Sequence, residues 1–294
     1  MTAPTPGVAA EAGHEATKVI GAAQGRQAPR PRPGRSVLPA VIIVGAFLYY
    51  VVPLIATASF ALSDGRHFSV TPLTDALGDP AFHDAITLSA GIAILTTIVS
   101  IVIVAPTSYL IVLRFRRIRT LVDFITILPF VIPPIILTLG LRQVYGAESP
   151  LGVNLVDSPL LIVGGYFILS LPFTYRAVDN AMRAIDVVLL TEASESLGAG
   201  ALRTFRLVIL PGSLLGIISA GLLCFTTVMG EFTLASLLGY ATFPVFLNNV
   251  YASAPREATS LVIVSFMITW AGVLALAGVG RRAGGGATAL RRAA

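Results

Sequence analysis

Apolar residues form six long runs along the 294-residue chain, and polar residues are largely confined to the segments between them. None of the runs contains Asp, Glu, Lys or Arg, and each reaches the ~18 residues that a helix needs to cross the hydrocarbon core of a bilayer. The runs cover residues 36–63, 85–113, 124–141, 158–175, 207–230 and 258–280. They lack the ten-residue alternation of a membrane β-strand, so the pattern predicts an all-α membrane protein with six transmembrane helices.

Prolines interrupt several runs, most densely in the sequence ILPFVIPPIILTLG of the third. Pro133 and Pro134 lack backbone N–H donors and are predicted to kink this helix. A kinked helix could line or gate a translocation path, although membrane helices also tolerate prolines without any such role. We keep both interpretations open.

Three ionisable residues lie within or at the edges of these apolar runs. Asp123 and Arg142 bracket the third run, where each side chain can reach a membrane interface, so we expect structural roles for both. Glu231 is different because apolar sequence continues on both sides of it. It is predicted either to make a structural hydrogen bond or to contact the translocation path in the outer part of the membrane.

The distribution of basic residues predicts the orientation. An even number of spans puts both termini on one side, and if that side is the cytoplasm, it holds 17 of the 20 basic residues. Only Arg66, Arg142 and Arg256 remain outside. Residues 1–36 are predicted to be a disordered basic cytoplasmic tail, and residues 281–294 a basic cytoplasmic tail. This asymmetry accounts for the net charge of +5 without invoking nucleic acid.

The remaining composition argues against an enzyme. The only lysine is Lys18, so no P-loop is present, and His14, His67 and His83 are scattered without metal-ligand spacing. The only cysteine, Cys224, is expected to pack as a small apolar residue. Four acidic residues share the first outer loop and are expected to be solvated: Asp64, Asp75, Asp79 and Asp84.

The connection between the fourth and fifth runs, residues 186–211, has a different character. Asp186 can cap a short helix, and Gly198 can end it and turn the chain. Leu202, Phe205 and Ile209 then recur at helical spacing, which predicts a second short amphipathic helix, before Pro211 starts a new direction. Such a segment either lies in the lipid interface or docks in a groove of another protein.

This connection resembles the cytoplasmic motif of permease subunits of binding-protein-dependent ABC importers. The motif reads E-A-A, three residues, G, nine residues, then I-x-L-P. This chain has Glu192, Ala193 and Ser194, then Gly198, and finally Val208, Leu210 and Pro211 at the same spacing. Ser194 and Val208 depart from the motif, and both are small changes in volume.

The resemblance implies a permease domain over residues 37–280, in a bacterial plasma membrane. Its loop would form a coupling helix in a cleft of a separate ATPase subunit, which binds ATP and Mg²⁺, while this chain binds no cofactor. The implied partners are two ATPases, a second permease, identical or paralogous, and an extracytoplasmic solute-binding protein. The residues implied in ATPase coupling are Glu192, Ala193, Gly198, Ala199, Leu202, Phe205, Leu210 and Pro211.

A finer resemblance concerns the substrate. The sequences SLGA, GEFTLASLLG and TFPVFLNNVY are similar to the permease group that serves polyamines, phosphonates, ferric iron, thiamine, sulfate and molybdate. Within it, we favour a polyamine or an aminoethylphosphonate-like compound, with iron, thiamine or an oxyanion as the alternative. An autonomous secondary transporter is the alternative of a different class, but it would normally show more intramembrane charge and internal repeats. The site candidates on the translocation path are Glu231, Pro133 and Pro134.

Overall fold

The computed structural model describes residues 37–63, 67–146, 149–150, 152–156 and 158–267. These residues are mostly helical, and the β-type pairing among them is one isolated bridge between Ser63 and Phe68. The all-α prediction is therefore confirmed for this part of the chain. The predicted basic tails and residues 268–280 of the sixth run lie outside the described residues.

The chain divides into two units between Ile55 and Ala56, inside helix α2 (Val37–Ala61). This helix contains no charged residue and is long and apolar enough to cross a membrane, as the first run predicts. The part of α2 up to Ile55 is the described portion of the first unit. The end of α2 and all the other described helices belong to the second unit.

The helices of the second unit follow one another along the chain with short connections. Residues 255–267 are also helical. The named helices are α3 (Thr71–Gly78), α4 (Pro80–Leu113), η1 (Arg116–Ile118), α5 (Arg119–Val131), α6 (Pro134–Tyr145), α7 (Pro159–Ala184), α8 (Val187–Ser196), α9 (Ala201–Thr204), η2 (Phe205–Ile209), α10 (Leu210–Gly212), α11 (Leu214–Met229), α12 (Thr233–Leu238) and α13 (Phe243–Ser253).

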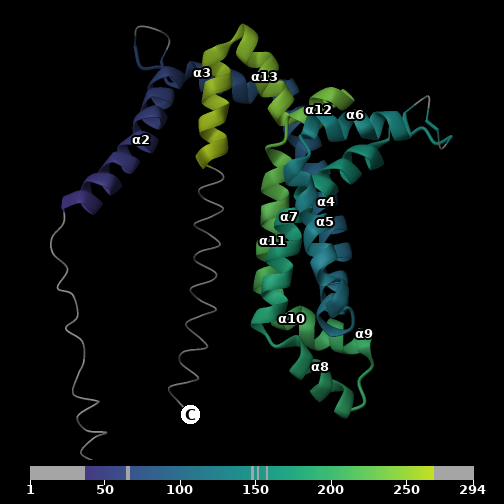
Figure 1. Cartoon of the computed structure of the whole chain (residues 1–294). Coiled ribbons are helices and arrows are strands. Elements are labelled where there is room, and N and C mark those ends of the chain that lie inside the picture. Colours follow the sequence, from purple (N-terminus) through teal and green to yellow (C-terminus); the bar gives the residue numbers. More distant parts are fainter. Residues whose placement is uncertain (1–36, 64–66, 147–148, 151, 157, 268–294) are drawn as a thin grey trace, which may run out of the picture. The chain divides into compact units, whose positions relative to one another are not determined.

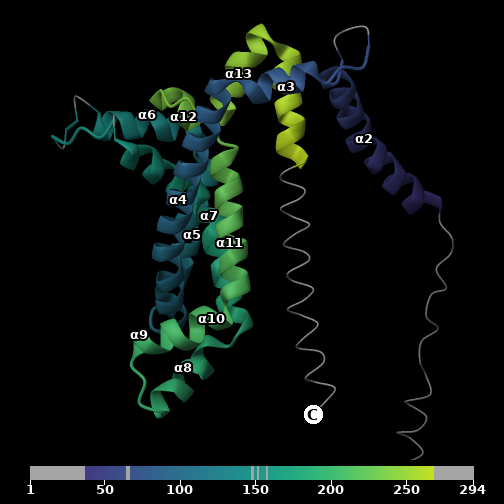
Figure 2. The same cartoon turned by 180° about the vertical axis from the view of Figure 1, so that it is seen from behind.

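Helices α4, α7 and α11 lie side by side and form the core of the second unit (Figures 1 and 2). α5 runs along α7. Helices α8 to α10 lie at one end of this bundle, and α6, α12 and α13 lie at the other. We call these the α8 end and the α12 end.

Small residues allow the three core helices to approach closely. A Cβ atom added to Gly216 of α11 would overlap the Cβ of Ala181 on α7, so the two backbones touch at this point. The face of α4 toward the bundle carries the buried hydroxyl residues Ser89, Thr96 and Ser100. Lipid tails are as apolar as the side chains, so membrane helices gain nothing by burying apolar surface against each other. They associate instead through the close van der Waals contact that small and hydroxyl side chains allow.

α4 begins five residues before the predicted start at residue 85. The Asp79 side chain accepts a hydrogen bond from the Ala81 amide at 2.8 Å, and Pro80 occupies the first helical position. An acidic cap followed by proline is a strong helix start. Asp79, expected to be only a solvated residue, therefore caps the longest helix of the protein's described part.

The third run is broken, rather than kinked as predicted. α5 and α6 meet at an angle of 102°. Two successive prolines remove two N–H donors, and each forces the residue before it out of the helical region: Ile132 has ψ 115° and Pro133 has ψ 138°. The helix therefore stops at Val131 and restarts at Pro134.

The fifth run is also bent, by 77° between the α9–α10 stretch and α11. The sequence predicts the change of direction at Pro211, but the turn comes at Ser213. The Leu210 amide bonds the Phe205 carbonyl, one residue further back than in an α-helix. This wider turn of η2 accommodates Pro211, so the helix continues to Gly212 before the chain changes direction.

Three helices of the described residues are each long and apolar enough to span a membrane: Ala40–Ala61, Pro80–Leu113 and Pro159–Ala184. The two bent pairs count as up to two more spans. The protein is therefore a multi-pass membrane protein.

The contact between α7 and α11 makes a testable prediction. Gly216→Ala places a Cβ against Ala181 and should destabilise the folded protein by about 1–3 kcal/mol, the usual cost of overpacking. Gly91→Ala on α4, where the added Cβ meets nothing within 4 Å, is the matched control and should be neutral or stabilising. Thermal unfolding in detergent measures both, and equal melting temperatures would contradict this packing.

Candidate functional site

The segment of residues 186–211, here called the motif segment, forms two short helical pieces at the α8 end. Asp186 begins the first piece in the left-handed region, with φ 47°, and its carboxylate accepts from the Leu189 amide at 3.3 Å. A capping aspartate is what the sequence predicts, and α8 follows it as expected.

One face of α8 packs on the bundle. Val187 and Thr191 are buried, and the Thr191 hydroxyl lies 3.3 Å from the hydroxyl of Tyr109 on α4. The opposite face carries Leu189, Glu192 and Ala193, all exposed. These positions are three and four residues apart, so they share one side of the helix.

A glycine turn ends α8. Gly198 has φ 81°, its amide bonds the Glu195 carbonyl at 2.9 Å, and the Ala199 amide bonds the Ser194 carbonyl at 3.0 Å. This pair of bonds is the Schellman arrangement, which satisfies the last carbonyls of a helix and needs a residue tolerant of positive φ. Gly198 and Ala199 of the motif thus have a defined backbone role.

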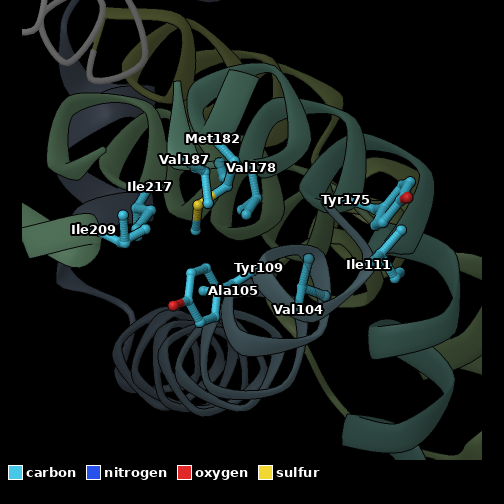
Figure 3. Close-up of a cluster of buried hydrophobic side chains, with 11 residues drawn as sticks. Val104, Ala105, Tyr109, Ile111, Tyr175, Val178, Met182, Val187, Ile209 and Ile217 are labelled. Carbon is cyan, nitrogen blue, oxygen red and sulfur yellow. The ribbon is translucent and has the colours of Figure 1, made fainter. Parts of the chain in front are cut away.

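The second piece of the motif segment, α9 with η2, is anchored by two apolar side chains. The Phe205 ring lies 5.2 Å from the Tyr109 ring, and Ile209 is 0% exposed. Figure 3 shows Ile209 beside Ile217 of α11, in the same buried cluster as Val187 and Met182. The motif segment is therefore joined through one core to α4, α7 and α11.

Leu202 does not share this inward face, contrary to the single face predicted for Leu202, Phe205 and Ile209. Its side chain is 62% exposed. The reason is that α9, which continues directly into η2, packs on α8. Leu197, in the turn, is 89% exposed.

We call the outward surface of the motif segment the exposed edge; it combines apolar and charged side chains. Of the other motif residues, Leu210 is half-buried against the core and Pro211 is exposed. The edge consists of Leu189, Glu192, Ala193, Leu197 and Leu202. An apolar surface with an acidic residue among its leucines is chemically suited to a groove on another protein.

An ion cluster near the α8 end was missed by the sequence reasoning. Asp179 of α7 accepts from Arg119 of α5 at 2.6 Å and from Arg183 at 3.0 Å. Arg119 also lies 3.6 Å from Asp123. The available signal was the spacing of Asp179 and Arg183, which marks a helix that continues nine residues beyond the predicted end of the fourth run at residue 175.

Glu231 makes the structural hydrogen bonds that were one of its two predicted roles. One carboxylate oxygen accepts from the Thr233 amide at 2.9 Å and the other from the Leu234 amide at 2.8 Å. Pro133 and Pro134 lie at the start of α6, which packs on α12. The three predicted path residues therefore belong to neighbouring elements at the α12 end.

Two other expectations on single residues are confirmed. Cys224 is buried, and its sulfur lies 3.6 Å from the Ser100 hydroxyl. Arg142 has a structural contact, because it donates to the Leu237 carbonyl at 2.9 Å. Within the described residues no group of three His, Cys, Asp or Glu side chains is placed to hold a metal ion.

Apolar helices of membrane length, two of them broken, together with the motif segment, give the chain the architecture of a multi-pass membrane protein. The comparison with protein families agrees, since residues 97–282 match the model of the binding-protein-dependent transport system inner membrane component. The match covers more than half of the chain. This chain belongs to that family, the permeases of binding-protein-dependent ABC importers.

Two relatives illustrate the range of the family. The spermidine/putrescine transport system permease PotB of Haemophilus influenzae is 28% identical over 232 residues, which cover 73% of this chain and 80% of the relative. The molybdenum transport system permease ModB of Azotobacter vinelandii is 30% identical over 212 residues, covering 64% of this chain and 92% of the relative.

A solved structure described as an amino acid ABC transporter with histidines shares the fold. It is 19% identical, with a TM-score of 0.50, and the match covers 69% of this chain and 94% of that chain. At this identity the likeness concerns the fold alone.

The anchoring of the motif segment makes a second prediction. Phe205→Ala should loosen η2 by about 2 kcal/mol, roughly half the cost of removing a fully buried phenylalanine, because the ring is only partly buried. Trypsin should then cleave faster at the exposed Arg203 and Arg206. Leu202→Ala, which removes an exposed side chain, is the control. The anchoring role is wrong if the two variants are cleaved at the same rate.

Proposed function

We propose that this chain is one half of the translocation path of an ATP-driven importer, and that the motif segment is its coupling helix. The observation that carries the proposal is the two-sided structure of the segment. Its inner side is built into the bundle through Phe205 and Ile209, whereas its exposed edge has no partner within the described chain.

The two sides support a simple mechanism. An ATPase subunit would grip the exposed edge in a surface cleft, with Glu192 making polar contacts and Leu197 and Leu202 filling apolar space. Movement of the ATPase would then shift Val187 and Ile209 together with their neighbours on α4, α7 and α11. A close-packed core transmits such a displacement as a rigid contact, because it deforms little.

We further propose six spans with both termini in the cytoplasm. The two bent pairs would serve as the third and fifth spans, and residues 258–280 as the sixth. The distribution of arginines supports this orientation, since the α8 end carries Arg183, Arg203 and Arg206. The membrane would be a bacterial plasma membrane.

The complete importer would contain two ATPase subunits, a second permease, identical or paralogous, and an extracytoplasmic binding protein. ATP and Mg²⁺ would bind the ATPases, and this permease would hold no cofactor. The exposed edge supplies one docking surface per permease, which supports the proposed pairing of two permeases with two ATPases.

For the substrate we propose a small charged solute, with a polyamine or an aminoethylphosphonate-like compound ahead of iron, thiamine or an oxyanion. The support is the similarity to a spermidine/putrescine permease; the similarity to a molybdenum permease keeps the oxyanion open. Glu231 adds nothing for a cation, because both its oxygens are engaged by backbone amides.

Co-purification tests the proposed function. The tagged chain, extracted in mild detergent with its native membrane partners, should bring down an ATPase subunit. Leu197→Ser combined with Leu202→Ser should reduce the recovered ATPase by at least roughly tenfold, since leucines buried in an interface contribute on the order of 1–3 kcal/mol each.

Leu160→Ser is the matched control, because Leu160 is an exposed leucine on α7 at the α12 end. It should retain the ATPase at the level of the unmodified chain. If the chain instead purifies alone and moves solute across vesicles without ATP, it is an autonomous secondary transporter and the proposal fails.

A further inference from the structure

The short helix α12 is held at both of its ends by side chains with complementary charge. At its start, the Glu231 carboxylate accepts from the first free amides, those of Thr233 and Leu234. At its end, the Arg142 guanidinium donates to the Leu237 carbonyl at 2.9 Å. An acid at the positive end and a base at the negative end of a helix both stabilise it.

Six residues are too few for a helix that is stable by itself, so α12 depends on these contacts and on its packing. Leu234 and Ala235 are both 0% exposed and belong to a cluster with Ile162 and Tyr166 of α7. Gly165 of α7 makes the notch for Leu234, because a Cβ there would lie 2.5 Å from the leucine Cδ2.

The two side chains that hold α12 come from different parts of the chain. Arg142 lies on α6, beyond the break at Pro133, and Glu231 lies in the turn between α11 and α12. The Tyr166 hydroxyl also donates to the backbone carbonyl of Glu231 at 3.4 Å, which fixes the turn between α11 and α12 to α7. α6 and α12 are thus joined to each other and laid across the α12 end of the bundle (Figures 1 and 2).

We propose that Arg142 and Glu231 are positioning residues for transport: Arg142 ties the end of α12 to α6, Glu231 caps the start of α12, and the helix clamped in this way seals the α12 end of the path. The seal opens when the Arg142–Leu237 bond breaks and Leu234 leaves its notch on α7. The opening step rests on the proposed function, whereas the clamp itself rests only on the contacts given above.

Thiol labelling measures the clamp directly. With Cys224→Ala, the chain has no native cysteine, and Ala235→Cys places a single thiol on the buried face of α12. A maleimide reaches this thiol only when α12 detaches, so the labelling rate reports its opening. The measurement uses the full chain in membrane vesicles.

In this background Arg142→Gln and Glu231→Gln should each speed labelling by roughly three- to tenfold, the factor that loss of one hydrogen bond produces in an opening equilibrium. Arg142→Lys keeps a cationic donor and should restore slow labelling. The matched controls are Arg256→Gln and Glu257→Gln, which remove the same charges from the helical residues 255–267 and should leave the rate unchanged.

Two outcomes overturn the clamp. One is an unchanged labelling rate in Arg142→Gln. The other, seen in chains that retain Cys224, is equal acceleration at that residue, because Cys224 lies in the core between α11 and α4 and should stay protected when only α12 opens.

A second arm tests the opening step in the complex with the co-purified ATPase. In the chain that carries Cys224→Ala and Ala235→Cys, with Arg142 and Glu231 unchanged, ATP and Mg²⁺ with vanadate should speed labelling. If Arg142→Gln speeds labelling but ATP does not, α12 is clamped without acting as the seal. If no ATPase co-purifies, the proposed function fails while the comparison of Arg142 variants still stands as a test of the clamp.

Discussion

The close approach of α4, α7 and α11 is the contact on which the other features of the second unit depend. In lipid, helices gain little by hiding apolar surface, so these three associate through small residues, with Gly216 against Ala181 as the tightest point. The packed bundle then supplies the surfaces that hold everything at its two ends. At one end Ile209 enters the core, and at the other Leu234 enters the notch at Gly165.

The second constraint is that a broken helix inside or near a membrane must satisfy the backbone groups that the break leaves free. The described part of the chain does this with a few polar side chains placed at the ends of its short helices. Asp186 and Glu231 accept from the freed amides at helix starts, and Arg142 donates to a carbonyl at a helix end. The same rule therefore explains polar residues at both the α8 and the α12 ends.

Much of this organisation could be predicted from the sequence, because it depends on local chemistry. The capping of α8 by Asp186, the turn at Gly198 and the interruption at Pro133 and Pro134 follow from backbone preferences of single residues. The packing of Cys224 follows from its apolar surroundings. The pattern of Glu192, Gly198 and Pro211 also predicted which connection between helices forms the motif segment.

What could not be predicted depends on contacts between distant residues. The bend at Ser213 rather than Pro211 comes from the wider turn of η2. The exposure of Leu202 depends on which helix α9 packs against. The ion pair between Arg119 and Asp179 joins residues 60 positions apart, and no sequence period reveals such a pair.

The central claim is that the motif segment is docked on the bundle by one side while the other side is free to bind an ATPase. Hydrogen exchange of residues 187–212, in the chain alone and in the ATPase complex, tests this most directly. The account predicts that the amides of η2 exchange slowly already in the free chain, and that binding slows exchange mainly in the turn around Leu197 and in the first turn of α9. Fast exchange throughout the segment in the free chain would contradict it.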